Sequence, residues 1–170
     1  MKPTNEAVVT FLSRSANEGF ARAAAACGVP LMLHTEKGAH APEAVRLCFR
    51  MGVAPEQMVV CHVDRQAADF APHEAVAQLG VYLDYDTVGR FKYHSDAEEV
   101  ALLRHMAGKG WGDRLLLALD TTAQRLASYG GEIGLCYILD TFLPMLAAAG
   151  FSPEERESFT VTNCRRLFAG

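Results

Sequence analysis

Short apolar stretches that alternate with longer helix-forming segments are the feature of this sequence that most limits its fold. The stretches at 31–33, 57–61, 81–85 and 114–119 are rich in Leu, Val and Met. Strands that are apolar throughout are covered on both faces, as in parallel sheets. Helix-forming segments flank them at 17–27, 42–51, 73–79, 96–107, 134–149 and 153–158. The series predicts an α/β protein with parallel strands.

The spacing of the strands indicates the kind of α/β fold. Successive strands begin roughly 25 to 35 residues apart, which suits the βα units of a barrel or of an open sheet. The chain has 170 residues, enough for one domain with its own core. No shift in composition marks a boundary, so we expect residues 1–170 to form a single domain.

Composition excludes several classes of function. The net charge is −4 and no basic block occurs, which argues against nucleic acid as the main partner. No apolar run approaches the roughly 20 residues of a membrane span. The first fifteen residues lack the pattern of a secretory signal. The five cysteines are odd in number and contain no CxxC pair, which predicts buried free thiols in a reducing cytoplasm.

Each of the four predicted strands ends in a side chain of the metal-ligand type. These residues are His34, His62, Asp86 and Asp120. Because the carboxyl ends of parallel strands lie on one face, we expect the four side chains to converge there. Two imidazoles and nearby carboxylates suit an ion such as Zn²⁺. Polar neighbours able to orient these ligands are Thr35, Glu36, Asp64 and Arg65.

Each of these residues also has a purely structural explanation. A single His after a strand is often a capping residue or a satisfied core residue. Asp86 and Asp120 are equally compatible with capping of the turns that follow. The joint pattern of four successive strands is what favours a metal or catalytic site over these separate explanations.

Several segments of the chain resemble one known family in order and spacing. Those at the strands are G-V-P-L-M-L-H-T-E (28–36), M-V-V-C-H-V-D (58–64), G-V-Y-L-D-Y-D-T-V-G (80–89) and R-L-L-L-A-L-D (114–120). Tyr129-Gly130-Gly131, Phe142-Leu143-Pro144 and T-V-T-N-C-R-R-L-F (160–168) follow towards the C-terminus. The chain is similar over almost its whole length to the phosphotriesterase family of the amidohydrolase superfamily, most of all to bacterial phosphotriesterase-homology proteins.

The resemblance implies a fold, a metal site and a reaction. The fold is a TIM-like (β/α)8 barrel, of which this chain would form the last four to five βα units. The site holds two zinc-type ions, and its implied ligands in this chain are a carboxylated Lys2, His34, His62 and Asp120. Asp120 is also the implied catalytic base, while Asp64 and Asp86 support it from outside the ligand shell. The implied substrates are small esters, lactones or phosphoesters. Glu36 and Arg65 are expected to shape the substrate pocket.

The chain departs from the family pattern in one important respect. The HxH pair of the family's first strand is absent. We therefore expect one metal ion or none, and at most weak hydrolase activity from this chain alone. A half barrel also leaves two sheet edges open, which favours self-association. The chain is then a gene fragment or a degenerate relative. Lys2 by itself resembles an ordinary exposed N-terminal lysine.

Two further interpretations remain open. The remaining histidines are assigned by position: His40 to a helix start, His94 to a loop at the mouth of the site, and His73 and His105 to helix surfaces.

The competing class of function is a truncated, non-catalytic αβ binding or interaction module. A phosphate-cradling glycine motif would support that class, but residues 130–134 read G-G-x-x-G and not GxGxxG.

Overall fold

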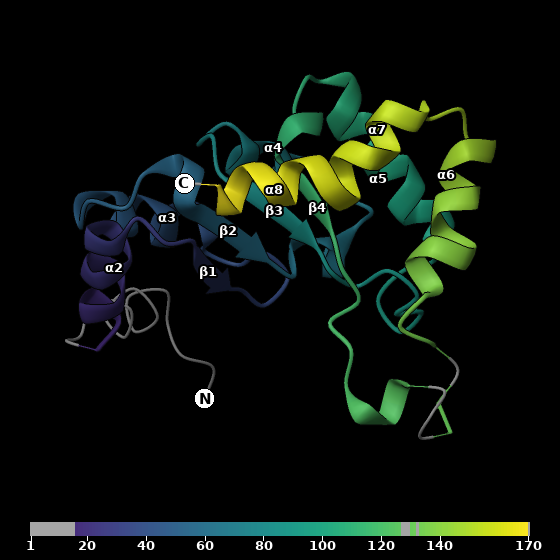
Figure 1. Cartoon of the computed structure of the whole chain (residues 1–170), viewed down its shortest axis with the longest axis horizontal. Helices are drawn as coiled ribbons and strands as arrows, with labels where there is room; N and C mark the ends of the chain where they lie inside the picture. Colours follow the sequence, from purple (N-terminus) through teal and green to yellow (C-terminus); the bar gives the residue numbers. More distant parts are fainter. Residues whose placement is uncertain (1–15, 127–129, 132, 170) are drawn as a thin grey trace.

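Four parallel strands form one sheet, and their spatial order follows the chain (Figure 1). The computed structural model describes residues 16–126, 130, 131 and 133–169. The strands are β1 (Leu31–His34), β2 (Met58–Cys61), β3 (Tyr82–Tyr85) and β4 (Leu115–Leu117). Each pairs in parallel with the next along the chain. The prediction of a parallel α/β fold is confirmed.

Helices connect successive strands and then continue beyond β4. In Figure 1, α2 and α3 lie at the β1 end of the sheet, and α5 and α6 lie at the β4 end. Within the described part of the chain, β1 and β4 each have a strand neighbour on one side alone. The helices are α2 (Ala16–Cys27), α3 (Ala41–Arg50), α4 (Ala71–Ala77), α5 (Asp96–Gly108), α6 (Leu143–Ala148), α7 (Pro153–Glu157) and α8 (Asn163–Phe168).

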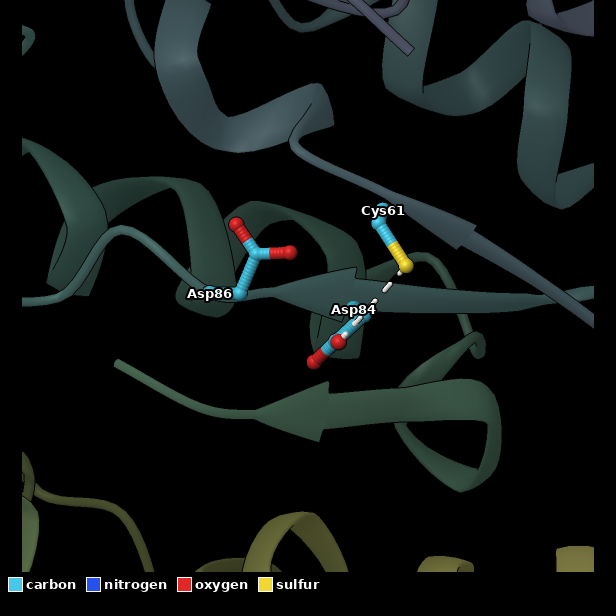
Figure 2. Close-up of side chains that lie close together, drawn as sticks. All are labelled: Cys61, Asp84 and Asp86. Atoms are coloured by element: carbon cyan, nitrogen blue, oxygen red, sulfur yellow. Dashed lines mark hydrogen bonds between the residues drawn. The ribbon is translucent and has the colours of Figure 1, made fainter. Parts of the chain in front are cut away.

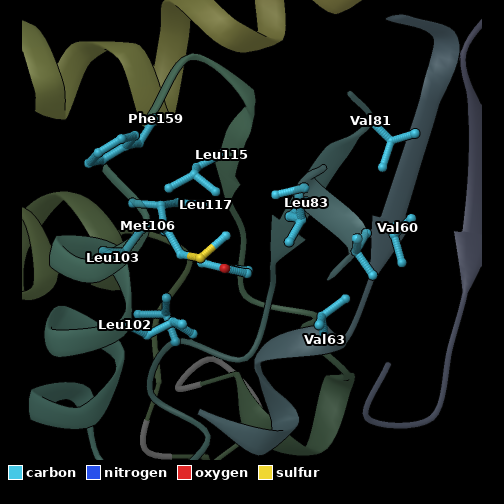
Figure 3. Packing of buried hydrophobic residues seen from close by; sticks show 14 of the residues in the cluster. Val60, Val63, Val81, Leu83, Leu102, Leu103, Met106, Leu115, Leu117 and Phe159 are labelled. Carbon is cyan, nitrogen blue, oxygen red and sulfur yellow. The ribbon is translucent and has the colours of Figure 1, made fainter. Parts of the chain in front are cut away.

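The main hydrophobic core lies between the sheet and its connecting helices. Figure 3 shows Val60, Leu83 and Leu115 of the strands packed toward Leu102 and Met106 of α5. All five side chains are fully buried. Burial of one such side chain contributes about 2 kcal/mol relative to full exposure. This core fixes the strands, and with them the side chains at their carboxyl ends.

The opposite face of the sheet carries a smaller cluster. Val59, Cys61, Tyr82 and Leu116 alternate along the strands with the residues of the main core, and Leu167 of α8 packs on them. Period-two alternation assigns these side chains to the second face. This face therefore carries a smaller apolar cluster, to which α8 contributes.

The long helix predicted at 134–149 begins later than the sequence pattern indicated. Regular helical structure starts with a wide π-helical turn at Ile138–Phe142, and α6 follows directly. The N–H of Leu143 donates to the carbonyl of Ile138, five residues earlier. Pro144 lacks an N–H and its ring crowds the preceding turn, which explains the wider turn at this point.

Two local predictions have opposite outcomes. Ser152 caps α7 as predicted, because its hydroxyl accepts from the N–H of Glu155 and the Glu155 carboxylate accepts from Ser152. The placement of His73 on a helix surface is wrong. His73 is fully buried, and its ring nitrogens contact the Tyr85 hydroxyl and the Gln66 carbonyl.

No helix among the described residues is long and apolar enough to cross a membrane.

Candidate active site

The four strand-end residues gather at the carboxyl edge of the sheet. His34 ends β1, while His62 and Asp86 directly follow β2 and β3. The ring centroids of His34 and His62 lie 4.5 Å apart in an edge-on arrangement. A pocket of about 320 Å³ opens here, lined by Met32, His34, Cys61, His62, Asp84, Asp86, Ala118 and Asp120. The structure thus brings these four sequence-distant side chains to one place.

The backbone at two of these positions is left-handed. His62 has a φ of 66° and Asp120 a φ of 40°. Residues other than glycine rarely adopt this region, and each such residue costs on the order of 1–3 kcal/mol. Strained positions of this kind cluster at functional sites, where the surrounding fold holds them in place. The strain at His62 and Asp120 therefore supports a functional role for this edge of the sheet.

Asp86 holds the imidazole ring of His62 in one orientation. Its Oδ1 lies 2.6 Å from His62 Nδ1, and its Oδ2 accepts a hydrogen bond of 3.2 Å from the backbone N–H of His62. One potential ligand atom each from His62, Asp86 and Asp120 lies within 4.8 Å of the others. A carboxylate on one ring nitrogen leaves the other nitrogen free to face a cation.

Burial decides the protonation of the His62–Asp86 pair. It raises the pKa of Asp86 to about 8, with the charges of Asp84 and Asp120 adding to the effect. Burial also lowers the pKa of His62, and the nearby Arg65 guanidinium lowers it further. Both shifts disfavour the charged forms of the two side chains. A cation in the pocket would reverse this preference by stabilising the ionised carboxylate.

Two inward-facing residues of the pocket were missed by the sequence analysis. Cys61 of β2 and Asp84 of β3 point toward one another, with 3.8 Å between the thiol sulfur and Asp84 Oδ2 (Figure 2). Burial raises the pKa of Asp84 to about 6. A carboxylate inside an otherwise apolar strand was the signal that would have identified Asp84, because such a group is costly to bury without a purpose.

Two arginines converge on Asp120. Arg65 Nη2 lies 3.2 Å from Asp120 Oδ2, and an Nη1 atom of Arg90 binds the same oxygen. The Tyr93 ring lies under both guanidinium groups, with its centroid 5.2 and 5.6 Å from their central carbons. Arg65 also bonds the exposed Glu36 at 2.9 Å. The mouth of the site therefore holds two guanidinium groups that are paired with the carboxylates of Asp120 and Glu36.

The other residues named from the sequence lie elsewhere. Asp64 is fully buried, and its Oδ2 accepts from the backbone N–H of Thr87 at 2.6 Å, so its carboxylate is not part of the pocket lining. His94 is buried beside Glu99 rather than at the mouth of the site. Lys2 lies outside the described residues.

The arrangement defines a class of protein. A parallel α/β sheet with flanking helices places histidines and carboxylates at the carboxyl ends of its strands, as TIM-barrel enzymes do. The model of the phosphotriesterase family matches residues 2–168. The chain therefore belongs to the phosphotriesterase family.

Individual relatives agree with this assignment. The phospho-furanose lactonase of Mycoplasmopsis synoviae is 28% identical, with 98% of this chain and 49% of the relative covered. The phosphotriesterase homology protein of Escherichia coli is 27% identical, with 97% and 56% covered. A crystal structure of that protein with phosphate in its active site superposes with a TM-score of 0.80 at 28% identity, covering 91% of this chain and 54% of the other. The chain spans about half the length of the curated relatives it matches.

Proposed function

We propose that this chain carries part of the active site of a hydrolase acting on ester, lactone or phosphoester bonds. The observation that supports the proposal is the convergence of His34, His62, Asp86 and Asp120 on one pocket at the carboxyl edge of the sheet. Residues 1–170 correspond, on this proposal, to the part of the barrel that follows the family's HxH strand. The relatives are about twice as long, and the part of them that this chain does not cover would correspond to the remaining wall.

The donor set fits a zinc-type ion. His34, His62 and Asp120 would hold it, with a carboxylated Lys2 as the additional ligand that the family resemblance implies. Imidazole and carboxylate are the ligands such borderline ions prefer. The His62–Asp86 pair is suited to the same role, because Asp86 fixes the ring orientation. When bound, a divalent ion polarises a carbonyl or phosphoryl oxygen and activates water near neutral pH.

The residues of the chain would divide the remaining tasks. Asp120, at the mouth of the pocket, would accept the proton from the attacking water on a carboxylate oxygen. Asp86 would hold His62 in place during the reaction through its two hydrogen bonds. Arg65 and Arg90 would compensate the negative charge that accumulates at Asp120 and on the substrate.

The arginines also favour a substrate that bears an anionic group. The side chains of Arg65 and Arg90 are only 9% and 13% exposed, yet each has an Nε without a hydrogen-bond partner among the described residues. Buried guanidinium donors without partners are costly, and a phosphate or carboxylate would satisfy them. The name of the M. synoviae lactonase indicates a phosphorylated substrate for that relative, which agrees with this inference.

The setting and assembly of the protein form part of the same proposal. All five cysteines are free, and free thiols support a reducing cytoplasmic environment. The prediction that the thiols are buried is right for Cys61 and wrong for the other four, of which Cys27 and Cys136 are exposed. At the open edge of β1, Met32 is 63% exposed and lines an apolar groove of about 320 Å³ with Phe20 and Leu47. This edge supports self-association, or pairing with the missing part of a barrel.

The test measures metal binding and hydrolysis on the full chain. We expect the chain to bind zinc, to bind one equivalent less in the His62→Ala variant, and to hydrolyse a chromogenic lactone weakly in a zinc-dependent manner. The His40→Ala variant is the control, because His40 lies outside the pocket lining. Zinc binding that is equal in wild type and His62→Ala would overturn the proposed site and would favour a non-catalytic interaction module.

A further inference from the structure

A second group of potential ligands lies buried outside the candidate active site. Asp64 follows β2, His94 lies in the loop before α5, and Glu99 is in the first turns of α5. Asp64 and Glu99 are fully buried, and His94 is 6% exposed. One ligand atom from each of the three side chains lies within 4.8 Å of the others. None of the three lines the pocket at the strand ends.

The two carboxylates of this group lack the partners that buried anions need. Asp64 Oδ1 and both oxygens of Glu99 make no hydrogen bond within the part of the chain that the structure describes. Neither carboxylate has Lys or Arg within 4.0 Å among the same residues. Such a pair requires a cation or bound protons.

The tautomer of His94 favours a cation. Its Nδ1 lies 3.1 Å from the backbone carbonyl of Ser95, a group that can only accept, so Nδ1 carries the proton. Nε2 of a neutral ring then presents its single lone pair, and the Thr87 hydroxyl oxygen lies 2.9 Å from it. That hydroxyl can turn its hydrogen elsewhere when Nε2 binds a cation. The same nitrogen lies 3.2 Å from Glu99 Oε2. A nitrogen lone pair and a carboxylate oxygen at this distance repel each other unless a cation or a proton lies between them.

We propose that Asp64, His94 and Glu99 bind a divalent cation of the zinc or manganese type, separate from the candidate active site. One imidazole and two carboxylates form a recognised ligand set for such ions. Tetrahedral ligands about 2.1 Å from a zinc ion lie roughly 3.4 Å from one another, close to the 3.2 Å between His94 Nε2 and Glu99 Oε2. The backbone carbonyl of Ser95 orients the imidazole as a ligating histidine requires.

The ion would have a structural role. It would tie the start of α5 to the segment that follows β2, and Thr87 after β3 contacts both Asp64 and His94. These segments carry His62 and Asp86 of the candidate active site, so the ion would stabilise their placement. The proposal does not depend on the proposed hydrolase activity, because it rests on a different set of ligands.

The experiment counts zinc on the full chain after removal of free metal. In a His62→Ala background, which disables the candidate active site, we expect one equivalent of zinc to remain. That equivalent should be lost in Glu99→Gln and in His94→Gln, each combined with His62→Ala. Glu43→Gln is the matched control, because it makes the same chemical change on an exposed part of α3. Zinc should also raise the melting temperature of His62→Ala more than that of either double variant.

The outcomes separate the cation from bound protons. If zinc is retained equally by Glu99→Gln and His94→Gln, the proposal is wrong. If metal-free Glu99→Gln is more stable than the wild type while the zinc count is unchanged, protons neutralise the cluster, and the proposal is also wrong. Should neither variant fold, absence of zinc from His62→Ala alone would overturn it. Failure of lactone hydrolysis leaves these readouts unaffected.

Discussion

Asp86 contacts His62 twice, at the Nδ1 atom of its ring and at the N–H of its backbone. The two contacts fix both the direction of the imidazole and the left-handed backbone that carries it. A ligating histidine held in this way binds metal more tightly than a freely rotating one, because less conformational freedom is lost on binding.

Replacement of Asp86 should weaken zinc binding at the candidate active site. We expect Asp86→Ala to lower the affinity by about 10- to 100-fold. Competition with a chromogenic chelator measures the change. The control is Asp140→Ala, which removes a carboxylate from an exposed position. An affinity for Asp86→Ala that equals that of the wild type would show that Asp86 does not orient a ligand.

The arginine pair should bind a simple anion. Inorganic phosphate is the probe, and we expect Arg65→Ala and Arg90→Ala each to weaken its binding by about tenfold or more, since a charge-assisted hydrogen bond is worth roughly 1.5–3 kcal/mol. Isothermal titration at low and high salt gives the affinities. Arg104→Ala is the matched control, because Arg104 pairs with Glu155 and the Ala149 carbonyl away from the pocket. Equal losses in all three variants would contradict specific binding.

The stability contributed by His73 should depend on pH. Burial lowers the pKa of His73 to about 4, below the 6.5 of an ordinary solvated histidine. As the pH falls below 6.5, the His73 ring is therefore protonated in the unfolded chain, whereas in the folded chain it stays neutral until about pH 4. The contribution is complete above pH 6.5 and disappears as the pH falls to about 4, and 2.5 pKa units correspond to about 3 kcal/mol.

Urea unfolding of wild type and His73→Asn at several pH values tests this expectation. The variant should be clearly less stable at pH 7.5, because it loses the contacts to Tyr85 and Gln66. The difference between the two proteins should shrink by pH 4.5. A difference that is constant over this range would mean that His73 titrates normally in the folded protein.

The capping box at Ser152 should stabilise the C-terminal helices. The Ser152 hydroxyl accepts from the Glu155 N–H at 3.2 Å. Ser152→Ala should reduce the free energy of unfolding by about 1 kcal/mol, and Ser152→Asp should restore most of the loss. Chemical denaturation provides the measurement. A loss that Ser152→Asp does not restore would point to a packing role for the serine instead.

The parallel order of the strands and the meeting of their end residues were predictable from the sequence. Apolar strands followed by His34, His62, Asp86 and Asp120 contain that information locally, because the carboxyl ends of parallel strands share one edge. The sequence could also locate the Ser152 cap, since its pattern spans only four residues.

Other features depend on contacts between distant parts of the chain. Arg65 and Asp120 are 55 residues apart, and no local pattern links them. The burial of His73 depends on the position of α4 against β3, where Tyr85 reaches its ring. Glu99 has the sequence context of an ordinary solvated residue in the first turn of a helix, yet the fold places it beside Asp64 and His94. Helical periodicity alone does not show how far a helix is rotated toward the sheet.

The left-handed backbone at His62 and Asp120 restricts how the site can evolve. Asn, Asp, His and Gly tolerate this conformation, whereas β-branched and bulky side chains do not. A saturation library at either position should therefore yield folded proteins mainly from this small group of residues. Exchange of one ligand type for another is open to selection here, but conversion of these positions to aliphatic residues is restricted by the backbone itself.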